Sequence, residues 1–141
     1  MEIQWFSKSL EGVTTIYETN ITLNTVAAEN FKSAYSTIVG FNKSENILFI
    51  KSLNKEEAVN NYDETDLHPI SIKPSYGRIN GKSLIKNICE VFPLDFTKKT
   101  FFKFKSEWDP ANKYLKVYLK EELSQWYLQS LKVWIPSDGL W

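Results

Sequence analysis

The chain contains few of the residues from which catalytic and metal sites are usually built. Its 141 residues include one cysteine, one histidine, one methionine and five glycines. A single cysteine excludes a disulfide within the chain, and with a single histidine it also excludes metal sites of the paired-cysteine kind. None of the glycines has the spacing of a nucleotide-binding loop. We therefore expect a non-enzymatic protein without metal or cofactor, in a reducing, cytoplasmic compartment.

Long apolar runs are also missing. No run approaches the roughly 18 residues that cross a bilayer, and the start, MEIQWFSKSLEG, has no signal-peptide pattern. We predict no membrane association. The chain does have ample apolar and aromatic material, at 43% and 15% of its residues. That is enough for the core of one domain, and it excludes disordered and fibrous proteins.

Charge is unevenly distributed although the formal net charge is zero. Residues 1–68 hold five lysines against ten carboxylates, whereas residues 69–120 hold ten lysines and Arg78 against four carboxylates. A segment this basic can neutralise phosphates and release their counterions. It can equally pair with acidic residues of the first half, within one chain or between chains. Because Arg78 is the only arginine, base-specific DNA reading through arginine forks is not expected.

Short strands and one short helix are predicted in the first half. Residues 3–17 have the composition of two short strands, and residues 21–23 alternate as a further one. Asn24 is a suitable N-cap for a helix of about three turns that ends near Ala34. Apolar residues on both sides of the polar stretch 42–46 are typical of a β-hairpin. The polar, acidic residues 54–68 that follow indicate a linker with a helical turn at its start.

The second half repeats this order. A strand at 70–72 and a turn at 75–77 lead to Asn80, which is placed like Asn24 before an apolar helical stretch that ends at Pro93. A second hairpin follows, with strands at 101–104 and 114–119. The caps are separated by 56 residues and the hairpins by 67, so an insertion of about eleven residues reconciles them. We predict an α+β domain of antiparallel strands.

The domain is expected to span residues 1–141 and to contain two βαββ-like half-repeats, 13–53 and 70–119, that share one core. Beyond them, apolar residues spaced by three and four predict a C-terminal amphipathic helix over 120–134. This helix is expected to cap the core, with a partner-binding role as the alternative. We predict a homodimer because the tail supplies anchors of the type enriched at interfaces, Trp126, Trp134 and Trp141.

The repeated order resembles the swapped-hairpin family of bacterial AbrB-like and MraZ-like proteins. The stretch YETNITLNTVAAENF is similar to the entry segment of that family, and SYGRINGKSLI is similar to it again, with Gly77-Arg78-Ile79 matching a glycine–arginine–isoleucine entry. Two copies in one chain resemble the MraZ plan. The resemblance implies an oligomeric, DNA-binding regulatory protein, with Arg78 as the one residue carried over.

Five basic residues are predicted to form a nucleic-acid-binding site: Lys73, Arg78, Lys82, Lys103 and Lys105. Arg78 and Lys82 flank the predicted helix start, where backbone N–H groups can also receive phosphate. The three other lysines extend this contact if the strands of the second half lie side by side. The alternation FFKFK at 101–105 suits stacking on bases, and it suits a half-buried strand equally well.

Three classes of function remain open at this point. The first is a regulatory protein that binds nucleic acid through its basic second half, and the second is a protein-interaction or structural module with no nucleic-acid binding. An enzyme with no recognisable motif is the third. His68, at the end of the linker, is predicted to be structural or solvent-facing. Cys89 is predicted to be a buried thiol on the apolar face of its helix.

Overall fold

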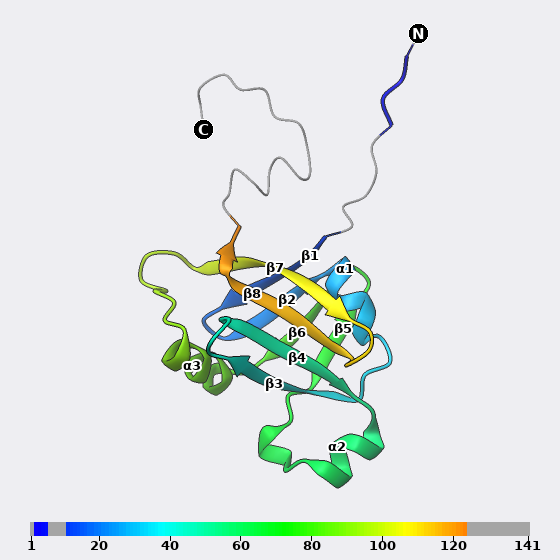
Figure 1. The fold of residues 1–141 in the computed structure, drawn as a ribbon, viewed down its shortest axis with the longest axis vertical. Coiled ribbons are helices and arrows are strands. Elements are labelled where there is room, and N and C mark those ends of the chain that lie inside the picture. The colour runs from blue at the N-terminus through cyan, green and yellow to red at the C-terminus, as the bar shows by residue number, and fades with distance from the viewer. Residues whose placement is uncertain (1, 6–10, 124–141) are drawn as a thin grey trace.

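The protein is an α+β molecule built on one antiparallel sheet, and the computed structural model describes residues 2–5 and 11–123 (Figure 1). Eight strands lie in the order β3-β4-β8-β7-β1-β2-β6-β5, and the sheet curls into a half-barrel. The strands are β1 (Gly12–Tyr17), β2 (Asn20–Asn24), β3 (Ser36–Asn42), β4 (Ile47–Leu53), β5 (Ile70–Lys73), β6 (Tyr76–Asn80), β7 (Phe101–Asp109) and β8 (Tyr114–Glu122). The helices are α1 (Thr25–Ala28), α2 (Lys55–Asn61) and α3 (Lys82–Val91), with single 3₁₀ turns at η1 (Glu29–Phe31) and η2 (Glu64–Asp66).

Alternation along each strand decides which side chains enter the core. In the first part of β7, residues 101–106, every second side chain is buried, beginning with Phe102. The residues between them face outward: Phe101, Lys103 and Lys105. β8 alternates in the same way. The FFKFK stretch is therefore a half-buried strand with its lysines on the outer face.

The two long hairpins are closed by loops of the same geometry. Residues 43–46 join β3 to β4, and residues 110–113 join β7 to β8. The residue before each loop, Asn42 or Asp109, accepts hydrogen bonds from backbone N–H groups of the loop. The last loop residue has a positive φ, 55° at Asn46 and 57° at Lys113. Both predicted hairpins are present, and equivalent loop positions are 67 residues apart.

Asn24 caps α1 as predicted, and it also ties the helix to β1. Its Oδ1 accepts hydrogen bonds from the backbone N–H groups of Ala27 and Val13, each at 3.0 Å. Its Nδ2 donates to the carbonyl oxygen of Glu11, also at 3.0 Å. One side chain therefore satisfies a free donor of the helix end and fixes the start of the neighbouring strand.

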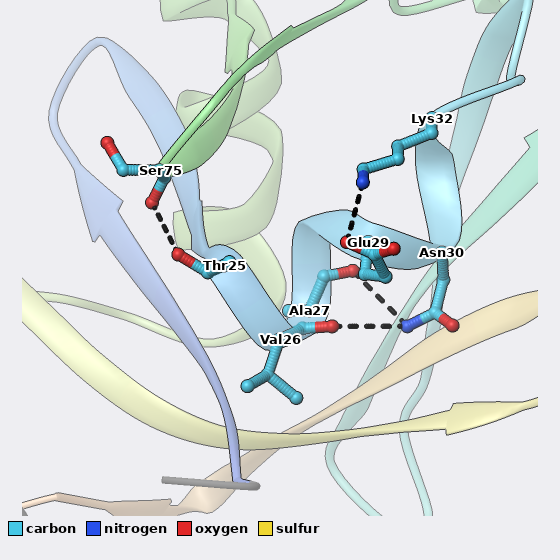
Figure 2. Close-up of polar contacts among 7 residues, drawn as sticks. All are labelled: Thr25, Val26, Ala27, Glu29, Asn30, Lys32 and Ser75. Atoms are coloured by element: carbon cyan, nitrogen blue, oxygen red, sulfur yellow. Dashed lines mark hydrogen bonds and ion pairs between the residues drawn. The ribbon is translucent and has the colours of Figure 1, made fainter. Parts of the chain in front are cut away.

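The first helix is shorter than predicted, since α1 and η1 together end at Phe31. Figure 2 shows a physical reason: the side-chain amide of Asn30 donates to the carbonyl oxygens of Val26 and Ala27, both at 3.4 Å. Such side-chain bonds compete with the continuing backbone pattern of a helix. In the same view the hydroxyl of Thr25 donates to the carbonyl of Ser75 at 2.9 Å, which joins α1 to the turn before β6.

The helix predicted after Asn80 is present as α3, but Asn80 is not its cap. Asn80 is the last residue of β6 and pairs with Asn20 of β2, so the ladder holds it in extended conformation. Gly81 occupies the cap position of α3 without a side-chain hydrogen bond, and its N–H donates to the carbonyl of Thr19 at 2.9 Å. The apolar face of α3 is buried as expected, and Cys89 is half-buried against the core.

Two strand predictions are also corrected. Residues 2–5 are not in a strand, so of the two strands expected over 3–17 the described residues contain β1 alone. The turn predicted at 75–77 lies one residue earlier, at 74 and 75, because β6 begins at Tyr76.

The C-terminal helix predicted for 120–134 does not begin where expected. Residues 120–122 continue β8, and the N–H of Leu123 donates to the carbonyl of Lys103 at 2.7 Å. β8 therefore extends into the first residues of the segment 120–134 that was predicted to be helical. The remainder of that helix lies outside the described residues, as do the three tail tryptophans on which the predicted homodimer rests.

Neighbouring hairpins in the sheet come from opposite halves of the chain. The β1–β2 hairpin lies between β7 and β6, and the β7–β8 hairpin lies between β4 and β1. Three ladders join the halves: β1 with β7, β2 with β6, and β4 with β8. Neither half forms a continuous block of the sheet.

Candidate nucleic-acid interface

Four of the five predicted basic residues lie on the outer face of neighbouring strands. β7, β1, β2, β6 and β5 are adjacent in the sheet, and we call their outward side the basic face. Arg78 on β6 and Lys73 on β5 are exposed there. Lys103 and Lys105 occupy outward, half-buried positions on β7. The two hairpins of the second half are not adjacent, and the β1–β2 hairpin of the first half bridges them.

The strand registers align these residues in rows. One row of successive Cα partners crosses all five strands: Lys103, Thr15, Thr22, Arg78 and Ser71. With about 4.8 Å between neighbouring strands, Lys103 and Arg78 are separated by roughly 14 Å along the sheet. Lys105 and Lys73 lie two residues further along β7 and β5, towards the same end of the sheet.

Aromatic rings lie among the cations of the basic face. The guanidinium carbon of Arg78 is 5.1 Å from the ring centroid of Tyr76. The Nζ of Lys103 is 5.5 Å from the ring centroid of Phe101, and that ring is 5.9 Å from Tyr17 on β1. At these distances each cation is attracted to the face of its ring, and the contact holds both groups in place. The face therefore offers flat apolar surfaces beside positive charge.

The charged outward residues of the basic face are cations on β7 up to Lys105, on β6 and on β5, and β1 and β2 carry no charge. The outward residues of 101–105 and of β1, β2, β6 and β5 are Phe, Lys, Val, Thr, Tyr, Asn, Arg and Ser, with no carboxylate among them. Carboxylates flank it at the ends. Glu11 and Glu107 line a cavity of about 390 Å³ together with Lys105, and Glu18 follows β1 at the opposite end.

Lys82 does not share the basic face. It is the first residue of α3, beyond the end of β6, whereas Lys73 lies at the opposite end of these strands. It lines a cavity of about 640 Å³ with Glu18, Lys86 and Glu90 among the other residues. The mixed charge around Lys82 therefore differs from the positive charge around Arg78.

His68 lines another cavity, of about 470 Å³, between β3 and α3. Its backbone N–H donates to the carbonyl of Thr37 at 2.8 Å. Burial of the half-buried imidazole lowers its pKa from 6.5, and the carboxylate of Asp66 opposes that shift. Sequence reasoning missed this cavity, because its walls come from segments that no local pattern relates to each other.

Within 2–5 and 11–123, no three His, Cys, Asp or Glu side chains are grouped so that they could hold a metal ion. None of the described helices combines the length and apolar character needed to cross a membrane. Comparison of the chain with family models, with curated proteins and with solved structures finds no match.

Proposed function

We propose that the chain consists of two equivalent half-units, residues 13–53 and 70–119, arranged on the plan that the swapped-hairpin regulators suggest. The order strand, strand, helix, strand, strand occurs in each half. The β2–β6 ladder supports the equivalence. Asn20 pairs with Asn80 and Asn24 pairs with Tyr76, and a shift of 56 residues converts either pair into the other.

The β4–β8 ladder supports the same proposal independently. Ile47 pairs with Tyr118 and Lys51 pairs with Tyr114, and here a shift of 67 residues exchanges the two pairs. These shifts equal the separations between the two Asn positions and between the two hairpins along the sequence. A ladder that maps onto itself under such a shift is the expected result of two-fold symmetry between the halves.

We propose that the protein is a non-enzymatic regulatory protein that binds nucleic acid through the basic face. The observation that carries this proposal is the gathering of four cations on the outer face of five adjacent strands, with no carboxylate among the outward residues of β1, β2, β5 and β6 or of β7 up to Lys105. The chain also has an acidic segment, so the gathering of cations away from carboxylates on the basic face is a specific arrangement of its charges. The resemblance adds Arg78, which lies on β6, one strand from the β5 edge of this face.

The mechanism follows from the residue types. Lys73, Arg78, Lys103 and Lys105 neutralise phosphates, and release of the condensed counterions drives binding. Tyr17, Tyr76 and Phe101 supply stacking surfaces for bases that are not already paired. Because lysine makes point contacts rather than bidentate forks, the sequence preference is small. We expect single strands to bind more tightly than duplexes, with a steep dependence on salt.

The test compares two double variants with the same change in net charge. Arg78→Ala with Lys103→Ala removes two cations of the basic face. Lys51→Ala with Lys116→Ala removes two cations from outward positions of β4 and β8. Binding to a labelled oligothymidylate and to a mixed-sequence duplex is followed by fluorescence anisotropy between about 50 and 200 mM salt. The first variant should lower the slope of log K against log salt by about two units, one for each lost contact.

Equal slopes for the two variants would assign the binding to net charge alone and contradict the basic face. Absence of binding by the unchanged protein at the lowest salt would end the nucleic-acid proposal and leave the interaction module. Lys82→Ala is expected to change the slope less than Arg78→Ala, because Glu18 and Glu90 lie around Lys82. Circular dichroism of each variant verifies that the fold is retained.

A further inference from the structure

β3 has a free edge. On one side it pairs with β4 along its whole length, from Ser36 with Leu53 to Asn42 with Ile47. On the other side a single bridge joins it to the chain just before β5. The N–H of Thr37 donates to the carbonyl of His68 at 3.1 Å, and the N–H of His68 donates back at 2.8 Å. Beyond this bridge the described part of the chain provides no further strand partner for β3.

The direction of the Thr37 backbone identifies the free groups. In an antiparallel strand the N–H and C=O of one residue point to the same side, and the side alternates from residue to residue. Since those of Thr37 point away from β4, those of Val39 and Phe41 do so as well. Their N–H groups make no hydrogen bond within residues 2–5 and 11–123. Two residues of β3 therefore present donors and acceptors for an additional strand.

A groove runs along this edge. It is the cavity of about 470 Å³ already described, and β3 residues 38–41 form one wall. The second wall is α3, through Leu84, Ile88 and Val91, of which Val91 is 48% exposed. The third is the segment 62–68, which contributes Tyr62, Asp66 and His68 among others. The free backbone groups thus lie beside a surface of mixed character, apolar along α3 and polar along the segment 62–68.

Gly40 lies between the two free residues, and nothing in the described molecule requires a glycine there. A Cβ atom at this position would have no neighbour within 4 Å, and the φ of Gly40 is outside the left-handed region. Its position is exposed. A strand glycine commonly marks a place where another backbone approaches closely. This is an observation independent of the free edge, and it indicates the same location.

We propose that the groove binds an extended peptide of a partner protein, which adds to β3 as a further strand. Its backbone would pair with Val39 and Phe41 across Gly40, and its alternate side chains would pack against α3. The lining contains the carboxylate of Asp66 and neither lysine nor arginine. The peptide is therefore apolar at alternate positions and carries a Lys or Arg at the end near Asp66. This inference does not depend on the nucleic-acid proposal.

A single peptide strand suits the groove better than a second copy of this chain. α3 and the segment 62–68 flank the free edge, so a strand added to β3 lies between them. The β3 edge of a second copy would bring its own α3 and its own segment 62–68 into that space. A peptide without attached walls avoids this overlap.

The test uses the full chain, isotope-labelled for amide NMR, and the peptide acetyl-KVTVTV-amide as the probe. We expect titration to shift the amide signals of Val39, Phe41 and Ile88 and to slow hydrogen exchange at the first two. The peptide acetyl-EVTVTV-amide should bind about tenfold more weakly, because its carboxylate meets Asp66. Absence of shifts at about 1 mM peptide, where even weak strand addition is detectable, would overturn the proposal.

Two pairs of variants separate binding from folding. Gly40→Thr should weaken binding at least about tenfold while the melting temperature stays or rises, since threonine suits strands better than glycine. Lys51→Thr, an outward change on β4, should leave binding intact. Val39→Pro removes an outward N–H and should remain folded without binding the probe, whereas Ile38→Pro removes a donor that faces β4 and should unfold.

Protection of Val39 and Phe41 in the peptide-free protein, equal to that of Thr37, would also overturn the proposal. The edge would then be covered by a second copy if protection falls on dilution, and by the same chain if it does not. Full peptide affinity in Gly40→Thr would place the probe elsewhere and count against the proposal in the same way.

Discussion

Asn46 and Lys113 end the two long hairpin loops with the same left-handed backbone, at φ values of 55° and 57°. This region is unfavourable for most side chains, and asparagine tolerates it better than lysine does. The preceding loop bonds are strong at Asp109, where hydrogen bonds from the Asn112 side chain and backbone lower the pKa of the carboxyl. The backbone at Lys113 is thus held in a conformation that its side chain disfavours.

We therefore expect Lys113→Gly to raise the free energy of unfolding by about 0.5–1 kcal/mol. Asn46→Gly should give a smaller gain, because asparagine already suits this conformation. Lys43→Gly, in the same type of loop but without a positive φ, is the control and should not stabilise. Urea denaturation measures all three. A stabilisation by Lys43→Gly equal to that of Lys113→Gly would mean that the backbone conformation is not the cause.

The two asparagines that precede the helices should differ in their contribution to stability. Asn24→Ala removes the helix cap and both bonds to β1, so we expect a loss of about 1–2 kcal/mol. Asn80→Ala changes an exposed strand position and should stay within about 0.5 kcal/mol. Similar losses for both variants, measured by thermal and urea unfolding, would show that Asn80 caps α3 after all.

Two buried threonines allow a matched comparison of hydroxyl groups. The Oγ1 of Thr14 is buried without a hydrogen-bond partner, whereas that of Thr37 donates to the carbonyl of His68 at 2.5 Å. Thr14→Val should stabilise the protein by about 1 kcal/mol, because a buried unpaired hydroxyl is costly. Thr37→Val should destabilise it by about 1 kcal/mol through the lost bond. A loss of stability in Thr14→Val would indicate that its hydroxyl does have a partner.

Stability should depend on the ionisation of His68 below neutral pH. Burial lowers the pKa of His68 from 6.5 in the folded protein, so the unfolded chain binds the proton first as the pH falls. Stability is therefore complete above pH 6.5 and declines as the pH falls towards the folded-state pKa. Between about pH 7.5 and 5.5, the unchanged protein should lose more stability than His68→Gln. Equal losses in the two proteins would assign the pH dependence to other groups.

The sequence predicted those parts of the fold that short-range patterns determine. Both long hairpins and the apolar face of α3 follow from alternation and from three-and-four spacing within a few residues. The cap at Asn80 was mispredicted because pairing with Asn20, a long-range contact, keeps that residue in the sheet. In the same way, β8 extends to Glu122 although apolar spacing predicts a helix from residue 120.

In the candidate sites, too, short-range patterns predict some features, whereas others depend on long-range contacts. Alternation in FFKFK already required the lysines of 101–105 to share one side of a strand. That Arg78 joins them depends on the β1–β2 hairpin lying between β7 and β6, which no local pattern indicates. The groove beside Gly40 depends on the separation of β3 from β5 beyond Thr37, and this was not predictable for the same reason.

The interleaving of hairpins has a consequence for how the chain acquires its structure. β1 and β2 find their other neighbours in β7 and β6, and β4 finds its second neighbour in β8. Three of the seven ladders of the sheet therefore form between residues far apart in sequence, which makes folding slower than it would be for a sheet of hairpins alone. During synthesis, β1, β2 and β4 leave the ribosome with one neighbouring strand each, and they gain the second only when the other half of the chain follows. Two fragments divided within the linker, near residue 62, should each remain unstructured alone and acquire the sheet when mixed.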